Sequence, residues 1–254
     1  MFAAILASAL AATSTFDHSA FDSLLRANVR DGLVDYDAFA RSSGFSSYLA
    51  SLGEASLEGR EESERLAFWM NAYNAWTIEL VNRHHERDSI RNIRRTLDHM
   101  PLESPWSERM VRAAGRELTL DEVEHGILRK EFEEPRVHFA LVCAALSCPP
   151  LRGEAYTGAR LDEQLDDQAR AFLLRSPEAN RVDPAAGEVW VSPIFIWYRD
   201  DFGGTDEALG RYLARYWPDG PERRLLLSGR FRLRETDYDW SLNSVAKGTA
   251  QRGR

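Results

Sequence analysis

The sequence is poor in cysteine, in lysine and in long apolar runs. Two cysteines among 254 residues are too few for a fold held together by several disulfides. The net charge of −8, without a basic stripe, argues against a nucleic-acid-binding surface, so no nucleic acid is expected as a partner. No stretch reaches the roughly 20 apolar residues that a transmembrane helix needs, so no transmembrane segment is predicted. The chain is long enough, with 44% hydrophobic residues, to bury a full core.

The first residues are apolar and end in small side chains. Residues 1–13 therefore predict a signal peptide. Such peptides usually carry a Lys or Arg before the apolar run, and this sequence has none there. We expect export to the periplasm or the extracellular space, with residues 14–254 forming one domain. In such an oxidising compartment a disulfide becomes an option.

Apolar periodicity along residues 14–254 predicts mostly helices, with a few short strands between them. The longest helical signal covers residues 61–86. Shorter helical signals cover residues 18–53 (apart from a turn at Asp31-Gly32), 121–130, 161–174, 194–202 and 205–216. Strands are predicted at residues 109–111, 117–120, 137–143, 181–182, 189–192 and 231–234, the first two forming a hairpin. The order of these elements predicts an α+β fold, a helix-rich single domain around a small sheet.

Residues 136–151, RVHFALVCAALSCPPL, contain both cysteines and one of only six histidines. On a regular strand His138 and Cys143 would face opposite sides and lie roughly 16 Å apart, which argues against a local nucleophile–base pair. Cys148 precedes two prolines, so it is expected on a rigid loop. Proline also suits the first turn of a helix, whose free N–H groups would lower the pKa of the Cys148 thiol. We therefore predict Cys148 to be the more exposed and reactive thiol. Cys143 stays an alternative if its base comes from elsewhere, for example His125.

Other interpretations of the two cysteines compete with a nucleophile. Cysteine is often simply buried, and a Cys143–Cys148 disulfide would close a small loop. A reversible redox pair ranks last, because C-x4-C is not the usual redox spacing. The same spacing, without a second ligand pair, argues against zinc, so no metal site is predicted.

Residues 121–129, DEVEHGILR, allow two interpretations. The spacing of Asp121 and Glu124 is that of a capping box, which would make Glu124 a capping acid and leave Arg129 solvated. Alternatively, Glu124 orients a histidine and Arg129 binds a carboxylate. From chemistry alone, the capping interpretation is favoured. Farther along, residues 198–202, YRDDF, offer carboxylates that could close over a site.

Two asparagines, Asn71 and Asn74, interrupt an otherwise apolar helical segment. Asparagine is a poor helix former, and a buried amide costs free energy unless it finds partners. We therefore expect both side chains to hold something in place: a loop, a histidine or a ligand. Interior hydrogen bonding to a neighbouring loop and a role in a site are equally compatible with the pattern.

Several of these segments together resemble the DUF547 family, which is named for having no assigned function. The matching pieces are FWMNAYNAW at 68–76, LDEVEHGILR at 120–129, HFALVCAALSCPPL at 138–151 and WYRDDF at 197–202, with LVDYDAF at 33–39 and YDWSLN at 238–243 near the two ends. The resemblance implies the bacterial, exported type. It also implies a papain- or transglutaminase-like arrangement of thiol and histidine, which could bind a small thiol peptide.

This resemblance implies a cysteine-dependent hydrolase or acyltransferase that acts on a peptide or another amide. The implied catalytic residues are Cys148 or Cys143 as nucleophile, His138 or His125 as base, and Glu124 or an asparagine as the group that orients the base. The implied binding residues are Asn71, which could stabilise an oxyanion, Asn74 and Arg129. The alternative is a module that binds a small molecule or thiol peptide without turnover. No cofactor is expected, the expected partner is a small-molecule or peptide substrate, and the oligomeric state cannot be read from the sequence.

Overall fold

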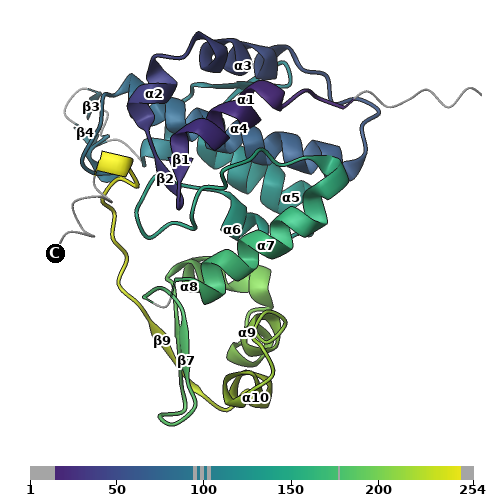
Figure 1. Ribbon diagram of the computed structural model, residues 1–254, viewed down its shortest axis with the longest axis vertical. Coiled ribbons are helices and arrows are strands. Elements are labelled where there is room, and N and C mark those ends of the chain that lie inside the picture. Colours follow the sequence, from purple (N-terminus) through teal and green to yellow (C-terminus); the bar gives the residue numbers. More distant parts are fainter. Residues whose placement is uncertain (1–14, 94–95, 98–99, 102–103, 177, 247–254) are drawn as a thin grey trace, which may run out of the picture.

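The computed structural model describes residues 15–93, 96–97, 100–101, 104–176 and 178–246. Helices are the predominant regular structure, and short strands form small sheets beside them (Figure 1). The predicted signal peptide, residues 1–13, lies outside the described residues. Among the residues that are described, no helix is both long and apolar enough to span a bilayer.

Helix α4, Glu62–Arg83, runs through the middle of the larger part of the molecule (Figure 1). Every side chain from Leu66 to Ile78 is buried, as expected for a helix that is apolar on all its faces. The helix contains no Gly or Pro, and its acidic first turn and basic last turn complement its dipole. The prediction of a long helix over residues 61–86 is thus confirmed.

Short elements surround α4. The helices are α1 Ser19–Asn28, α2 Tyr36–Ala40, α3 Ser43–Glu54, η1 Ile90–Asn92, η2 Pro105–Ser107, η3 Glu122–Leu128, α5 Arg129–Glu131, α6 Val137–Ala140 and η4 Gly158–Arg160. The strands are β1 Val29–Arg30, β2 Leu33–Val34, β3 Thr96–Leu97, β4 Met100–Pro101, β5 Val111–Ala113 and β6 Arg116–Leu118. These strands pair as three antiparallel hairpins.

Two of the hairpins were predicted in whole or in part. The β5–β6 hairpin turns at Ala114-Gly115 and pairs Val111 with Leu118, as the sequence indicates. The β1–β2 hairpin turns at Asp31-Gly32, both with positive φ. A Cβ on Gly32 would lie 2.4 Å from the Cβ of Pro150, so only glycine allows this turn to pack against the cysteine loop.

The smaller part of the molecule follows α7, Leu161–Leu174, which extends from one part to the other (Figure 1). Its elements are β7 Arg181–Asp183, β8 Glu188–Val191, α8 Ile194–Trp197, η5 Arg199–Phe202, α9 Asp206–Leu213, α10 Pro221–Ser228 and β9 Arg232–Glu235. Strand β8 pairs antiparallel with β7 and parallel with β9. Only α10 is absent from the predicted elements, although Pro221 at its start and Gly229 after its end are the usual signals.

The buried side chains form two hydrophobic clusters. The larger cluster surrounds α4, and the smaller one lies among α7, α8, α9 and the three-stranded sheet. Phe139 of α6 belongs to the smaller cluster, while its neighbours Val137 and Ala140 belong to the larger one. Tyr238 packs against both. The region around α6 and Tyr238 is therefore where the two clusters meet.

The strand predicted at residues 137–143 is wrong. Residues Val137–Ala140 form the short helix α6, and the chain then runs on without regular structure to a turn at Ala144, whose φ is 70°. A short apolar run cannot by its periodicity distinguish a buried strand from a buried helix. The argument that His138 and Cys143 face opposite sides of one strand therefore no longer holds.

Candidate functional site

A cavity of about 440 Å³ lies where the two clusters meet. Its lining combines polar, acidic and aromatic side chains with both sulfur atoms. It is lined by Tyr73, Ser104, Trp106, Asp121, Glu124, His125, His138, Leu141, Cys143, Cys148, Pro149, Ile194, Trp197, Tyr198, Tyr238 and Trp240. Five predicted catalytic residues therefore line one cavity, although they come from two separate segments of the chain, 121–129 and 136–151.

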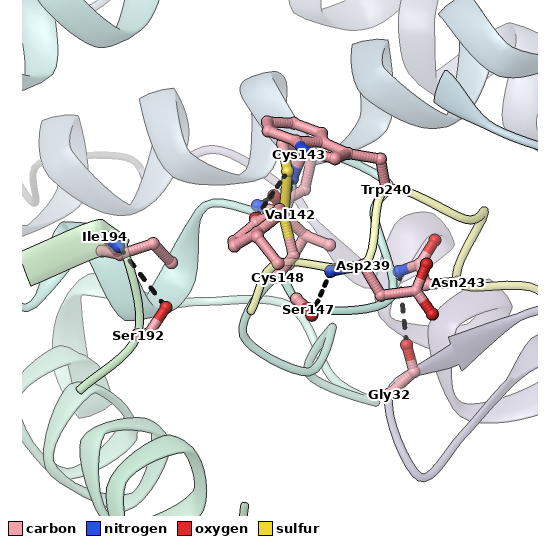
Figure 2. The surroundings of a disulfide bond; sticks show 12 residues. Gly32, Val142, Cys143, Ser147, Cys148, Ser192, Ile194, Asp239, Trp240 and Asn243 are labelled. Atoms are coloured by element: carbon pink, nitrogen blue, oxygen red, sulfur yellow. Dashed lines mark hydrogen bonds between the residues drawn. A yellow bond between two sulfur atoms is a disulfide. The ribbon is translucent and has the colours of Figure 1, made fainter. Parts of the chain in front are cut away.

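Cys143 and Cys148 form a disulfide in one wall of this cavity (Figure 2). The Cys143 N–H donates to the Cys148 sulfur at 3.0 Å, and the Tyr238 hydroxyl donates to the same sulfur at 3.2 Å. Of the alternatives predicted for the two cysteines, the structure thus contains the disulfide. Neither cysteine carries a free thiol. A nucleophilic role for either cysteine requires the reduced form.

The C-terminal segment fastens the loop that joins the two cysteines. The Leu146 N–H donates to the Ser241 carbonyl at 2.7 Å, and the Asp239 N–H donates to the Ser147 hydroxyl at 2.8 Å (Figure 2). These bonds hold the loop independently of the disulfide.

Two expectations for Cys148 are wrong. Its side chain is buried, at 8% exposure, whereas Cys143 is partly exposed. No helix begins at Pro149-Pro150, so no helix N-terminus is present to lower the thiol pKa. Burial in the larger hydrophobic cluster explains the low exposure, because the prolines pack the loop against the protein and not out into solvent.

His138 is fixed on α6 by a carboxylate 63 residues farther along the chain. Its Nε2 lies 2.6 Å from Asp201 Oδ2, and its ring stacks on Tyr198 with the centroids 3.9 Å apart. Burial lowers the pKa of His138, against the opposite effect of Asp201, so the neutral ring is favoured. Because Nε2–H donates to the carboxylate, the neutral ring carries its lone pair on Nδ1. His138 therefore has the tautomer of a general base.

Arg129 does bind a carboxylate, but one from the protein itself. Its Nε and Nη2 donate to the two oxygens of Asp201 at 2.7 and 3.0 Å. Asp201 in turn is the main cause that raises the pKa of Arg129. Arg129 also lies over the Tyr198 ring, 5.0 Å from its centroid. Its role is to hold Asp201 in place beside His138, so the solvated Arg129 of the capping interpretation is wrong.

Glu124 is not the capping acid. The capping box is formed two residues earlier: Thr119 N–H donates to Glu122 Oε2 at 2.8 Å, and Glu122 N–H donates to Thr119 Oγ1 at 2.9 Å. Glu124 instead is buried in the cavity wall and accepts a hydrogen bond from the Tyr73 hydroxyl at 3.1 Å. Its helix, η3, is a π-helix, a rare form that often occurs at functional sites.

His125 is exposed and also lines the cavity. Its Nδ1 lies 3.2 Å from Arg129 Nη1, and its ring centroid lies 6.2 Å from that of Tyr198. Tyr198 therefore contacts both candidate bases, and of the two only His138 has a carboxylate partner fixed at hydrogen-bond distance.

Aromatic side chains form the wall next to the disulfide. The Tyr238 ring lies 4.5 Å from Trp240 and 4.9 Å from Trp197, centroid to centroid, and Trp106 lies 6.2 Å from Trp240. Figure 2 shows Trp240 on the Cys143 side of the disulfide. Trp197 is 49% exposed. We refer to Trp106, Trp197, Tyr238 and Trp240 as the aromatic wall.

Asn71 and Asn74 each hold a piece of main chain. Asn71 donates to the Tyr156 carbonyl at 2.8 Å and accepts from the Tyr156 N–H at 2.9 Å. Asn74 donates to the Ala140 carbonyl and accepts from the Val142 N–H, both at 2.9 Å. Neither amide lines the cavity. The loop-holding interpretation is the one that these contacts support, and Asn74 holds the segment that leads directly to Cys143.

Comparison with known proteins identifies part of the chain. Residues 57–173 match a family model described as protein of unknown function, DUF547. This stretch is a DUF547 domain. No curated protein matches the chain, and no solved structure does, so a likeness to papain or transglutaminase is not shown. The DUF547 domain contains Glu124, His138 and both cysteines, whereas Asp201 and the Trp197, Tyr238 and Trp240 of the aromatic wall lie beyond its end.

Sequence reasoning missed the aromatic wall and Tyr73 as parts of the site. Trp197 and Tyr198 precede the acidic pair at 200–201, and Tyr238 and Trp240 stand in YDWSLN, so each lies within a piece that carries the family resemblance. Tyr73 stands between the two asparagines of FWMNAYNAW. Except for Trp106, which lies in none of the quoted motifs, the signal was therefore present, but nothing in the sequence indicated that these motifs meet in one cavity.

Among the described residues, no group of three or more His, Cys, Asp or Glu side chains could hold a metal ion. The cavity lining offers the two sulfurs, the histidines, the carboxylates and the tyrosine hydroxyls.

Proposed function

We propose that the chain is a cysteine-dependent hydrolase or acyltransferase acting on a peptide or another amide, and that it works in the reduced form. One observation carries the proposal: a single cavity brings together both sulfurs, Glu124 and a neutral His138 that Asp201 fixes in place. A nucleophile, a base and a group that orients the base are the parts that acyl transfer through a thiol requires.

Cys143, the less buried of the two cysteines, is the candidate nucleophile in this proposal. After reduction its thiolate attacks the amide carbonyl, and the thiol proton goes to His138 Nδ1. The tetrahedral intermediate collapses, the C–N bond breaks, and the imidazolium returns the proton to the leaving amine. The resulting thioester is released by water or by a second amine. Asp201 stabilises the imidazolium through its bond to Nε2.

Reduction is the step that separates the active from the inactive form. A dithiol or two monothiols convert the Cys143–Cys148 disulfide to two thiols and are themselves oxidised to a disulfide. Cys148 then serves as the thiol that closes the disulfide again. Export, which stays a prediction, fits the presence of this bond, because disulfides persist in oxidising compartments.

Alkylation of the reduced, folded protein tests the proposal. We expect iodoacetamide to label Cys143 faster than Cys148 when each is the only thiol, in Cys148→Ser and Cys143→Ser respectively. Replacing the base, His138→Gln, should slow the alkylation of Cys143 at pH 7 by about tenfold or more, in line with general-base contributions. His125→Gln is the matched control and should have a smaller effect. If neither cysteine of the native, reduced protein is alkylated, the nucleophile is excluded.

Turnover is tested separately. A panel of peptide p-nitroanilides should be cleaved only after reduction, and Cys143→Ser should abolish cleavage while Cys148→Ser retains it. Equal cleavage by wild type and Cys143→Ser would contradict the assignment.

A binding module without turnover is the second candidate. The specific observation in its favour is that the disulfide leaves the cavity intact while it occupies both sulfurs. Saturable ligand binding with no product in the reduced and in the oxidised form would support this candidate over the enzyme.

A further inference from the structure

We propose that the cavity selects ligands that carry a primary ammonium group, with Glu124 as the counter-ion and the aromatic wall packed against the cation. The inference rests on the proposed function and deepens it, because it predicts that the amide substrate carries a positive charge. It uses Glu124 as a binding residue for the ligand and not as a group that orients the base.

The first support is that Glu124 is a buried carboxylate without a cation. It is 8% exposed, and its hydrogen-bond partners, Tyr73 and Tyr198, are hydroxyls and not cations. Within the described part of the chain, no Arg, Lys or His nitrogen lies within ion-pair distance of it. Burying an ionised carboxylate costs several kcal/mol unless a charge compensates it. A ligand cation would supply that charge.

Two other poorly exposed carboxylates of this protein do pair with cations, in contrast to Glu124. Glu154 pairs with Arg26, Arg152 and Arg160. Glu134 pairs with Arg136. Arg129 lies in the same stretch of chain as Glu124, but its guanidinium pairs with Asp201. Arginine thus compensates these carboxylates, whereas no ion pair among the described residues compensates Glu124 in the cavity wall.

The second support is the sign of the charge that lines the cavity. Asp121 and Glu124 are among the described lining residues, and no Lys or Arg is. His138 is neutral because burial lowers its pKa. Such a cavity attracts a cation and repels an anionic ligand.

The third support is the aromatic wall. Indole and phenol rings attract cations at their faces, most strongly where water is excluded. Trp240 already binds a cation in this way, since the Arg91 guanidinium lies 5.4 Å from the centroid of its ring. Tyr238 and the half-exposed Trp197 belong to the same ring cluster and line the cavity. A carboxylate and aromatic rings that line the same cavity are groups suited to bind an alkylammonium ion.

The experiment uses the oxidised protein, in which no free thiol can react. Binding of benzylamine, benzyl alcohol and benzoate is measured by tryptophan fluorescence and by calorimetry at pH 7. The three probes share a ring and differ in charge. A hydrogen bond to a charged group contributes about 1.5–3 kcal/mol, so benzylamine should bind roughly ten- to a hundredfold more tightly than benzyl alcohol. Benzoate should bind most weakly.

Two glutamate variants locate the charge. Glu124→Gln should bring the affinity for benzylamine down to that for benzyl alcohol and leave the affinity for benzyl alcohol unchanged. Glu131→Gln is the matched control: it removes an exposed carboxylate from the adjoining helix α5 and should keep the wild-type ratio. Trp197→Leu, at a half-exposed position, should weaken both ligands and benzylamine more.

Two outcomes overturn the inference: equal binding of benzylamine and benzyl alcohol by the wild type, or an unchanged ratio in Glu124→Gln. If Glu124→Gln does not fold, the wild-type ratio and Trp197→Leu decide. The proposed function fails independently. If the protein prefers the ammonium probe but cleaves no substrate after reduction, the enzymatic function is excluded and the binding site is retained. If it cleaves charged and uncharged amides equally fast, the enzymatic function is retained and the selection for an ammonium group is excluded.

Discussion

At the scale of single residues, the choice between two capping boxes decides the role of Glu124. Two overlapping capping boxes are present in the sequence, one from Thr119 to Glu122 and one from Asp121 to Glu124. The chain uses the first, which has the preferred Thr at the cap. That choice leaves Glu124 free to enter the cavity wall. The preference was readable from the sequence, but the consequence for Glu124 was not.

His18 gives a prediction for the effect of pH on stability. It is 5% exposed, its Nδ1 lies 2.7 Å from the Tyr48 hydroxyl, and burial lowers its pKa to about 4. Because the unfolded chain takes up this proton near pH 6.5 and the folded chain does not, the stabilisation is fully present above pH 6.5. It is lost as the pH falls from 6.5 to about 4, by about 3 kcal/mol in total.

The measurement is urea unfolding between pH 7 and pH 4.5. His18→Leu should be less stable at pH 7, because Tyr48 loses its partner, but its free energy of unfolding should fall less steeply towards low pH. His85→Asn removes an exposed imidazole and should keep the wild-type slope. A wild-type slope in His18→Leu would show that another group causes the acid sensitivity.

At the scale of elements, α4 positions the site through its two asparagines. Each side-chain amide pairs with one donor and one acceptor of a neighbouring segment, as a strand would, and Asn74 does so for Ala140 and Val142. The long helix thus fixes the irregular chain between α6 and Cys143. The cost of two asparagines in an apolar helix was a correct sequence signal that something is held, and the structure identifies it as main chain.

Replacement of Asn71 or Asn74 should destabilise the fold in both cases, but only the replacement of Asn74 should change the reactivity of Cys143. Asn74→Ala and Asn71→Ala should each lower the free energy of unfolding by about 2 kcal/mol or more, because each leaves a buried N–H and a buried carbonyl unpaired. In addition, Asn74→Ala should change the alkylation rate of Cys143 in the reduced protein, since it frees the preceding segment. Asn71→Ala should not, because it holds Tyr156 instead. Equal rates in the two variants would contradict a specific role of Asn74.

At the scale of the whole molecule, the cavity depends on chain segments beyond the DUF547 domain. His138 comes from the domain, and its partner Asp201 from the segment after α8. The disulfide comes from the domain, and Tyr238 from the chain near the end of the described residues. The two hydrophobic clusters share these contacts, so the single domain of residues 14–254 stays the prediction, with one cooperative unfolding transition expected.

Reduction of the disulfide should leave the fold intact. The bond closes a loop of sequence separation 5, and so short a loop contributes about 2 kcal/mol. Hydrogen bonds such as that from the Leu146 N–H to Ser241 hold the loop as well. With reductant we expect an unchanged circular dichroism spectrum and a melting temperature lower by a few degrees.

The double variant Cys143→Ser, Cys148→Ser is the control for this experiment. It should match the reduced wild type in melting temperature and should not respond to reductant. Loss of secondary structure on reduction would mean that the disulfide is required for folding, and the proposed reduced, active form would then be excluded.

The sequence by itself determined the long helix α4, the β5–β6 hairpin, the helices α7 and α9 and the segments that carry the chemistry. These features depend on local periodicity and turn residues, which act between neighbours in the chain. Tertiary structure decided the rest: that residues 137–140 form a helix, that the two cysteines are joined, and that Asp201 and Tyr238 meet His138 and Cys148. Such contacts follow from how buried faces pack across long chain separations, and no local pattern encodes that packing.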